Sequence, residues 1–365
     1  MSEELVNQLA LELIPGIGHR GVKQLISYCG SASQVLQAPK SKLLKVPGLG
    51  EKLANTILKS SDTSEAKRII QDAEKLGTKI LHITDKEYPK LLKQVPDSPN
   101  ILFKKGSGDV NPMRSVAVVG TRKATNYGKQ ITERIIRDLT ELNATVISGL
   151  AYGIDIHAHK ESLKNNLPTI GVVAGGIDRI YPSVHKKYAE EMQENGAILT
   201  ESLPGTKPDR HLFPARNRII AGMAHSTIVV EAAEKGGALI TANIADSYNR
   251  TVFAVPGDIG STYSEGTNKL IATQRALIYT GVEDLVFHLG WDSEKNKPVD
   301  KPLPELSTEE ETIYLLLKES GSPLEIDAIA IKTQIAINQV ASHLLSLEFK
   351  NLVKSMPGKK FGTVR

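Results

Sequence analysis

Apolar residues follow one spacing in the first 75 residues of the chain and another between residues 115 and 290. In the first segment they recur every three or four positions, as in LVNQLALELI, VKQLISY and KLANTIL, which predicts helices. In the second segment, short β-branched runs alternate with helical stretches such as YGKQITERIIRDLTEL. The six runs are SVAVVG, TVISG, TIGVVAGG, AILTES, STIVVEAA and TVFAVPG. Because they are continuously apolar, as strands covered on both faces are, we predict an α/β domain with a Rossmann-like, doubly wound parallel sheet.

Two glycine-containing breaks form an internal repeat in the helical segment. IPGIGHRG and VPGLGEKL share the order Pro-Gly-apolar-Gly, with glycines at 16 and 18 and again 32 residues further on. Glycines permit a tight turn, and the free amide groups at the start of the next helix can bind a phosphate oxygen. This helix-hairpin-helix pattern, of the SAM-like kind, is compatible either with DNA contact or with a small helical bundle that docks another protein.

A third segment begins where the composition changes near residue 291. DSEKNKPVDKPLPELS has no periodicity and predicts a linker over residues 291–307. TEEETIYLLLKESG, IDAIAIKT and AINQVASHLLSLEFKNLVKS then predict three helices, and MPGKKFGTV predicts a β-hairpin. This order is typical of a winged helix. We therefore expect a helical domain at 1–75, an extended Rossmann-like core at 76–290 and a winged-helix domain at 308–365.

Composition narrows the class of protein only slightly. The 365 residues include 45 Lys and Arg against 41 Asp and Glu, so a polyanion partner has to be argued from local clusters. The single Cys29 allows no intramolecular disulfide. The acidic start does not resemble a signal peptide, and the chain has no 18-residue apolar run. We expect a cytoplasmic protein without a membrane partner.

Each of the six predicted strands ends in a loop that contains glycine. In chain order these loops are GTRKATNYG, GLAYGIDIHAH, GGIDRIYP, the stretch PDRHLFPARNRIIAG, EKGGALITA and PGDIGSTYSEGTN. Ligands of open parallel sheets bind at the carboxyl ends of the strands, where glycines let backbone amides approach a phosphate. The sequence therefore predicts a long anion-binding rim along one sheet edge. The loop GTRKATNYG, after the first strand, is not GxGxxG, and the chain has no GxxxxGK[ST], which counts against nicotinamide and ATP as cofactors.

Basic side chains gather in the fourth of these loops. Arg210, Arg216 and Arg218, with Lys207, face the single acid Asp209 around a Phe-Pro corner that is expected to start a helix. A guanidinium there can reach a phosphate. The Phe213 ring either stacks on a nucleobase or packs under the helix, and both roles remain open.

No catalytic group or metal site is predicted. His157 and His159 are two apart on an expected helix and point to different sides, which is poor metal geometry. Asp155 is expected to cap that helix, with His159 one turn further on, and a structural role is favoured over catalysis. We expect a protein that binds its ligand without cofactor or metal.

The strand-end motifs resemble the DprA family, also called Smf, of bacterial DNA-processing proteins. VAVVGTRKATNYG, ISGLAYGIDIHAH, GGIDRIYP, FPARNRIIAG, VVEAAEKGGALITA and AVPGDIGSTYSEGTNKLI follow the family order across roughly residues 82–290. The resemblance implies a protein without known catalytic turnover that binds single-stranded DNA during natural transformation. It also implies a homodimer that helps to load the RecA recombinase.

The resemblance also implies DNA contacts for particular residues. Arg122, in the GTR motif, matches a family arginine that contacts phosphate, and Arg210 stands where many relatives have a DNA-binding lysine. Lys186 or Lys187 lies near another such position. The full predicted DNA-binding set is Gly120, Arg122, Gly149, Lys186, Lys187, Arg210, Phe213, Arg216, Asn217 and Arg218. Three positions depart from the family pattern: YPSVHKKY lacks an Asn, EKGGALITA replaces the usual SGSL or SGAL form, and Asn351 stands where Gly is typical.

Two other functions stay open. PGDIGSTYSEG imitates the PGGxGTxxE loop of nucleotide-releasing phosphoribohydrolases, although Asp258 replaces the second glycine and Glu265 has a different spacing. A transcriptional regulator would instead use the winged helix to read duplex DNA. Residues 350–365 carry five basic residues and no acid, which is compatible with a nucleic-acid contact or with a solvated tail.

Overall fold

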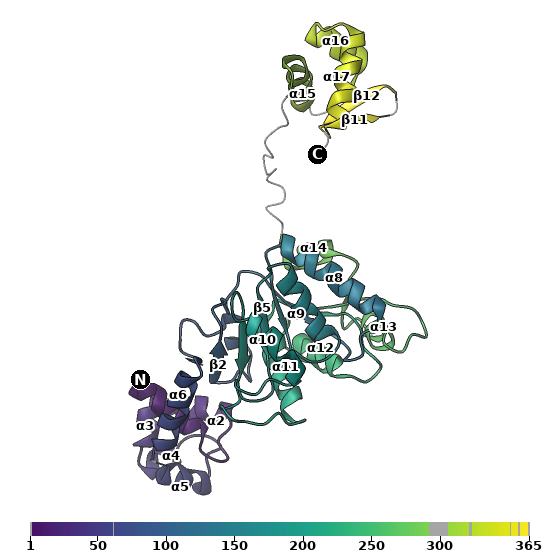
Figure 1. Ribbon diagram of the computed structural model, residues 1–365. Helices are drawn as coiled ribbons and strands as arrows, with labels where there is room; N and C mark the ends of the chain where they lie inside the picture. Colours follow the sequence, from purple (N-terminus) through teal and green to yellow (C-terminus); the bar gives the residue numbers. More distant parts are fainter. Residues whose placement is uncertain are drawn as a thin grey trace. The chain divides into compact units, whose positions relative to one another are not determined.

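The chain folds into two compact units, residues 1–293 and residues 294–365, and each is described by itself. The computed structural model describes residues 2–60, 62–291, 306–320, 323–350, 352–356 and 358–363 (Figure 1). Most of the predicted linker, residues 292–305, lies outside this range, as do Asn351 and Arg365. Among the described residues, no helix is both long and apolar enough to cross a membrane.

The larger unit is built on a nine-stranded sheet with the order β1-β2-β6-β5-β4-β3-β7-β8-β9. In this spatial order, all strands from β6 across the sheet to β9 are parallel to one another. β1 and β2 are added antiparallel beside β6. Their bounds are β1 Lys79–His82, β2 Ile101–Lys105, β3 Ser115–Val119, β4 Thr145–Ser148, β5 Thr169–Val172, β6 Ala197–Thr200, β7 Ser226–Val229, β8 Thr251–Ala254 and β9 Leu277–Ile278. The six predicted strands are β3 to β8, so the doubly wound sheet is confirmed.

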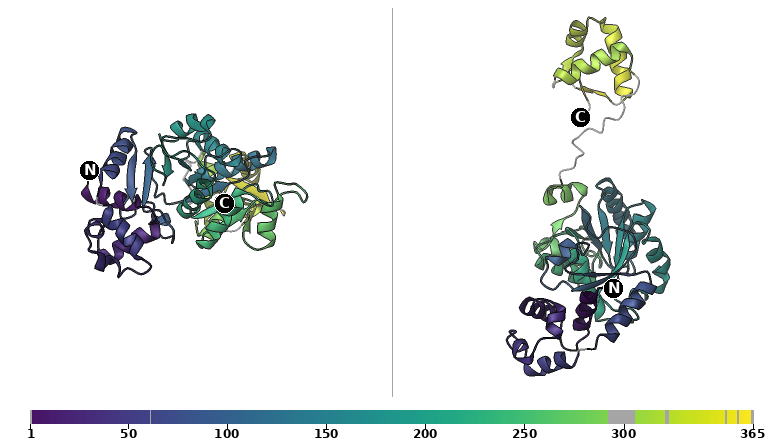
Figure 2. Two further views of the ribbon diagram at one scale, coloured as in Figure 1. Left: turned by 90° about the horizontal axis from the view of Figure 1, so that it is seen from below. Right: turned by 90° about the vertical axis from the view of Figure 1, so that its left-hand side faces the viewer.

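Helices cover both faces of this sheet (Figure 2). In β3, Val116 and Val118 pack under α8 (Asn126–Glu141), α9 (Ile154–Lys164) and α14 (Val282–Leu289). Ala117 and Val119 face the opposite layer, formed by α11 (Leu212–Met223), α12 (Gly237–Ser247) and α13 (Glu265–Ala272), together with the short α7 (Lys90–Lys93). Side chains of a strand alternate between the two faces, so every position of β3 is buried.

The N-terminal segment forms six helices: α1 Glu3–Glu12, α2 His19–Cys29, α3 Ala32–Leu36, α4 Lys40–Leu43, α5 Glu51–Lys59 and α6 Ser64–Lys75. The first glycine turn packs against α5, because Leu53 Cδ1 is 3.6 Å from the position of a Cβ on Gly16. Gly16 and Gly48 have φ values of +87° and +79°, which explains why glycine stands there. α1 and α6 share a hydrophobic cluster with Phe103 of β2.

The smaller unit has the predicted winged-helix order. Three helices, α15 (Thr308–Ser320), α16 (Ile326–Thr333) and α17 (Ile337–Phe349), enclose a core that includes Ile313 and Leu344. A three-stranded sheet completes the unit, with β10 (Leu324–Glu325) paired to β12 (Lys360–Thr363), and β12 paired to β11 (Val353–Met356). Two of its basic residues make ion pairs: Lys350 with Glu310 at 2.8 Å and Lys360 with Glu325 at 3.8 Å.

Candidate nucleic-acid interface

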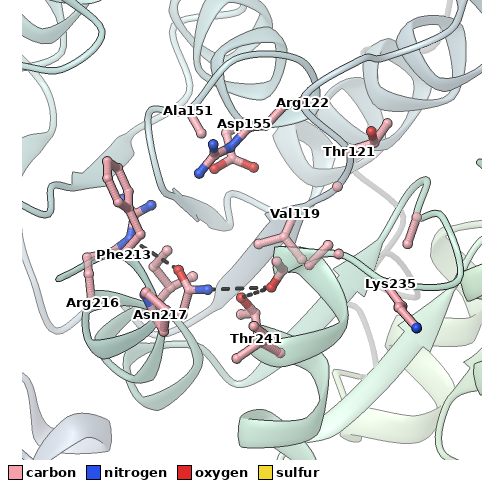
Figure 3. Close-up of a pocket in the computed structure, with 18 of the residues that line it drawn as sticks. Val119, Thr121, Arg122, Ala151, Asp155, Phe213, Arg216, Asn217, Lys235 and Thr241 are labelled. Atoms are coloured by element: carbon pink, nitrogen blue, oxygen red, sulfur yellow. Dashed lines mark hydrogen bonds between the residues drawn. The ribbon is translucent and has the colours of Figure 1, made fainter. Parts of the chain in front are cut away.

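A cavity of about 740 Å³ opens at the carboxyl ends of the parallel strands (Figure 3). It lies where β3 is flanked by β4 on one side and β7 on the other, which is the point where the strand order reverses. The loops after β3, β4, β5, β6 and β7 all contribute to its lining. Four basic side chains and one carboxylate line it: Arg122, Arg210, Arg216, Lys235 and Asp155. The site is therefore a cationic crevice suited to an anion.

One wall of the cavity combines a cation with two aromatic rings. The Arg122 guanidinium carbon lies 5.4 Å from the centre of the Phe213 ring, within cation–π distance. The Tyr181 ring meets Phe213 edge to face, with ring centres 5.9 Å apart. Tyr181 is 53% exposed and Phe213 is half-buried, so the aromatic surface is accessible. Phe213 thus packs against neighbours and still faces the cavity.

A buried charge pair forms the floor of the cavity. Arg216 donates hydrogen bonds from Nη1 to the carbonyl oxygens of Gly149 and Val172, which hold its guanidinium in place. Burial lowers the pKa of Arg216 to about 10, and the Asp155 carboxylate opposes this shift. Burial raises the pKa of Asp155, while Arg216 acts in the opposite direction. At neutral pH the floor therefore keeps a fixed guanidinium that contributes positive potential.

Glycine is required at position 149, where the backbone passes this pair. A Cβ on Gly149 would lie 2.6 Å from both Arg216 Nη2 and Asp155 Oδ2. The prediction that Asp155 caps its helix is wrong, because the N-cap of α9 is Gly153 and Asp155 lies in the first helical turn. The Asp155 carboxylate instead accepts backbone N–H groups of Ala151 and Gly120, which ties the loop after β3 to the start of α9.

Comparisons with known proteins decide the family. The family model for DNA recombination-mediator protein A matches residues 79–290, and the model for the DprA winged-helix domain matches residues 297–359. A model for a SAM-like helix-hairpin-helix tandem matches residues 9–61. The chain belongs to the DprA family. The first model alone spans the whole parallel sheet and every loop around the cavity.

Relatives of this DprA-family chain match along much of its length. Protein Smf of Synechocystis sp. is 31% identical over 97% of both chains. DNA processing protein DprA of Bacillus subtilis is 39% identical over 60% of this chain and 73% of its own length. The X-ray structure of DprA from Streptococcus pneumoniae superposes with a TM-score of 0.68 at 30% identity, over 79% of this chain and 98% of that one.

A further solved relative is DNA processing protein A of Helicobacter pylori, whose structure was described for its single-stranded DNA binding mode. It superposes with a TM-score of 0.54 at 29% identity and covers 60% of this chain and 97% of that one. These matches agree with the helical, Rossmann-like and winged-helix organisation of the family member described here.

The predicted DNA-binding residues of this family member lie partly inside the cavity and partly outside it. Six of them line the cavity: Gly120, Arg122, Arg210, Phe213, Arg216 and Asn217. Gly149 lies behind the cavity floor as the acceptor for Arg216. Lys186 and Lys187 are exposed on α10 (Lys186–Glu191), where they pair with Glu190 and Glu191 at 3.8 and 3.6 Å. They therefore lie outside the cavity, on an exposed surface.

Arg218 is held by other protein groups and does not line the cavity. Its guanidinium donates to the carbonyl oxygen of Asp97 and pairs with the Glu201 carboxylate, and its side chain is 13% exposed. The lining residues outside the predicted set include a cation, Lys235, and an aromatic ring, Tyr181. Both stand in strand-end loops that had been recognised, so their position beside glycine or proline was the available signal.

The other groups considered for chemistry are accounted for by packing. His159 is buried with Nδ1 2.7 Å from Thr169 Oγ1, and burial lowers its pKa to about 3. A second cavity, of about 380 Å³, includes Asp258 and the buried Glu231. The Glu231 carboxylate accepts hydrogen bonds from the backbone N–H and the hydroxyl of Thr125, so it holds the start of α8.

Proposed function

We propose that this DprA-family protein binds single-stranded DNA along the strand-end rim, without strong sequence preference. The observation that carries the proposal is the cavity wall in which Arg122 lies against Phe213 and Tyr181, above the fixed guanidinium of Arg216. Phosphates pair with the cations, and bases stack on the rings. The described binding mode of the Helicobacter pylori relative supports the same ligand.

The lack of sequence preference follows from the kind of contacts available. Arg122, Arg210 and Lys235 are exposed cations at the cavity, and cations contact phosphates, which are the same in every sequence. Every base has a π-face, and stacking on an aromatic side chain contributes about 1–3 kcal/mol per base. The exposed Lys186 and Lys187 extend the cationic surface beyond the cavity. A polymer suits this length better than a mononucleotide does.

A binding titration on oligo-dT tests the proposal. The double variant Arg122→Ala, Arg210→Ala should weaken binding more than about tenfold at fixed salt, because two phosphate contacts are lost. Arg137→Ala is the matched control, since Arg137 is exposed on α8 and does not line the cavity. An unchanged affinity in the double variant, with the control also unchanged, would remove the rim from the DNA-binding surface.

We further propose that the bound strand is protected and passed to the RecA recombinase during natural transformation and recombination, in the cytoplasm and by a homodimer. This part rests on the family of the chain. It predicts that the protein accelerates the DNA-dependent ATPase of RecA on oligonucleotides covered by single-stranded-DNA-binding protein. The Arg122→Ala, Arg210→Ala variant should not accelerate it; equal acceleration by the variant would contradict a role of the rim in loading.

The phosphoribohydrolase is kept as a second candidate because the PGDIGSTYSEG loop borders the second cavity. Its buried Glu231 is held by Thr125, which favours a structural carboxylate over a catalytic one. Release of free base from nucleoside monophosphates would revive this candidate. A transcriptional regulator that reads duplex DNA with its winged helix is disfavoured. Its recognition helix would be α17, INQVASHLLSLEF, which carries no Lys or Arg to contact the DNA backbone.

A further inference from the structure

The helices α8 and α9 pack against each other (Figure 1). Glu133 of α8 meets His157 and Glu161 of α9. His157 and Glu161 are four residues apart in α9 and therefore share one face of that helix. Glu133 approaches them from α8, with its Oε1 3.1 Å from His157 Nε2. One ligand atom from each residue lies within 4.8 Å of the other two. His159, which the sequence analysis placed on another side of the helix from His157, is not part of this cluster.

We propose that these three side chains bind a zinc ion. Zn²⁺ takes imidazole nitrogen and carboxylate oxygen at about 2.0–2.2 Å in tetrahedral geometry, which places ligand atoms of one sphere about 3.5 Å apart. The present spread of up to 4.8 Å closes by small rotations of the two glutamate side chains. A nitrogen ligand beside two carboxylates favours zinc over magnesium, which prefers oxygen ligands alone. Three protein ligands leave the fourth position for water.

Burial and charge fit a cation at this place. The side chains of His157 and Glu161 are 18% and 14% exposed, so both are largely shielded, while Glu133 is half-exposed and leaves a way in. Lys164 pairs with Glu161, with its Nζ 3.4 Å away, and its own side chain is largely exposed. A divalent ion replaces this pair at shorter distance and neutralises both carboxylates, where partial burial strengthens the attraction.

The site lies outside the DNA cavity and is independent of the function proposed above. It joins α8, whose first turn follows the loop of Arg122, to α9, whose first turn contains Asp155. A bound ion therefore braces α8 against α9 and stabilises the folded chain by mass action, to an extent set by the free zinc concentration.

The test uses the full-length protein, purified without a histidine tag and stripped with a chelator. Titration calorimetry with Zn²⁺ should show one equivalent per chain, and zinc should raise the midpoint of thermal unfolding. His157→Ala and Glu161→Gln should both lose the binding step and the thermal shift. The matched control is His19→Gln, because His19 also contacts two glutamates, Glu12 and Glu201, and should leave zinc binding unchanged.

Cobalt substitution reports directly on metal coordination, which would not change if the three side chains only helped to pack the two helices. Co²⁺ bound by the unmodified chain should give the visible absorption of four-coordinate cobalt, and Glu161→Gln should abolish it while its far-ultraviolet circular dichroism stays that of the parent. The proposal is overturned if zinc does not bind stoichiometrically, if both site variants retain it, or if His19→Gln loses it.

Discussion

The His19 imidazole lies 3.1 Å from the Glu201 carboxylate and so links the N-terminal helical segment to the loop that follows β6. Its other ring nitrogen is 3.0 Å from Glu12. Glu201 also pairs with Arg218 of α11, so one carboxylate connects α2, the β6 loop and α11. The same β6 loop leads to Arg210. The helical segment is therefore positioned to hold the basic loop in place.

This contact predicts how stability depends on pH. Hydrogen bonds with Glu12 and Glu201 raise the pKa of His19 to about 9 from 6.5. Because the pKa is higher in the folded state than in the unfolded state, protonation of His19 stabilises the fold fully below pH 6.5. This stabilisation is lost as the pH rises through 9. Because the imidazole is 38% exposed, solvent screens the pairs, and we expect only about 1 kcal/mol. Urea unfolding of the parent and His19→Gln should differ at pH 6 and converge above pH 9.5; equal stability at pH 6 would contradict the contact.

Arg216 should matter more for folding than for contact with the ligand. Its replacement by Met leaves the carbonyls of Gly149 and Val172 without a donor and Asp155 without its cation. Breaking a buried charge pair from one side costs about 3–5 kcal/mol. We expect a free energy of unfolding reduced by that amount in urea titrations. A loss below about 1 kcal/mol would mean that Asp155 takes up a proton at little cost.

A single methyl group at Gly149 should disturb the same pair. In Gly149→Ala the Cβ meets Arg216 Nη2 and Asp155 Oδ2 at 2.6 Å, so the pair has to shift. Overpacking of this kind costs about 1–3 kcal/mol and should also weaken oligo-dT binding. Gly236→Ala is the control on the same rim, because nothing lies within 4 Å of its added Cβ and its φ is −170°. If both variants behave alike, the close approach at Gly149 is unimportant.

Phe213 and Arg122 should be separable by the salt dependence of DNA binding. Phe213→Leu keeps an apolar side chain but loses the ring. Affinity should therefore fall by about 1–3 kcal/mol, or roughly 5- to 150-fold, at every salt concentration. Arg122→Ala should also lower the slope of log affinity against log salt by about 0.7, the value for one phosphate of a single strand. An unchanged affinity in Phe213→Leu would assign the ring to packing with Tyr181 alone.

Strongly apolar elements were predictable from the sequence, and weakly apolar ones were not. The runs that became β3 to β7 are buried at every position, and β8 at all but its first, so nearly every residue carries the signal. β1 and β9 lie at the two edges of the sheet and β2 lies next to β1. β1 and β2 were missed because KILH and ILFKK are short and end or begin in exposed or half-exposed lysines. β9 has only two residues, which is too short for any periodicity.

The site was predictable as a set of loops but not as a set of roles. Strand direction alone places the loops after β3 and β6 at one edge, so the position of Arg122 and Arg210 followed from chain order. Nothing in PARNRI distinguishes Arg216, which is buried in the cavity floor, from Arg218, which bonds Glu201 behind it. That difference is set by helix rotation against the sheet. The meeting of Glu133 with His157 is likewise a tertiary contact, 24 residues apart.

The open edge of the sheet gives a surface for the proposed homodimer. β9 pairs only with β8 in the described sheet, and its Leu277 and Ile278 are 38% and 47% exposed. Phe287, on the helix that follows, is 79% exposed. An unpaired edge strand with apolar side chains is suited to pair with the same edge of a second copy about a twofold axis. Light scattering after size-exclusion chromatography should therefore give a dimer for the parent chain.

Charge at this edge should separate the copies. Ile278→Lys combined with Phe287→Glu places charges where two identical edges would meet, and we expect a monomer. Ile259→Lys is the control, because Ile259 is fully exposed on the loop after β8 and lies outside the proposed contact. A dimer that survives the double variant would exclude this edge as the interface, whereas a dimer lost in the control as well would show an effect of charge alone. Because neither Ile278 nor Phe287 lines the cavity of Arg122 and Arg210, the monomer should keep the per-chain affinity for short oligo-dT.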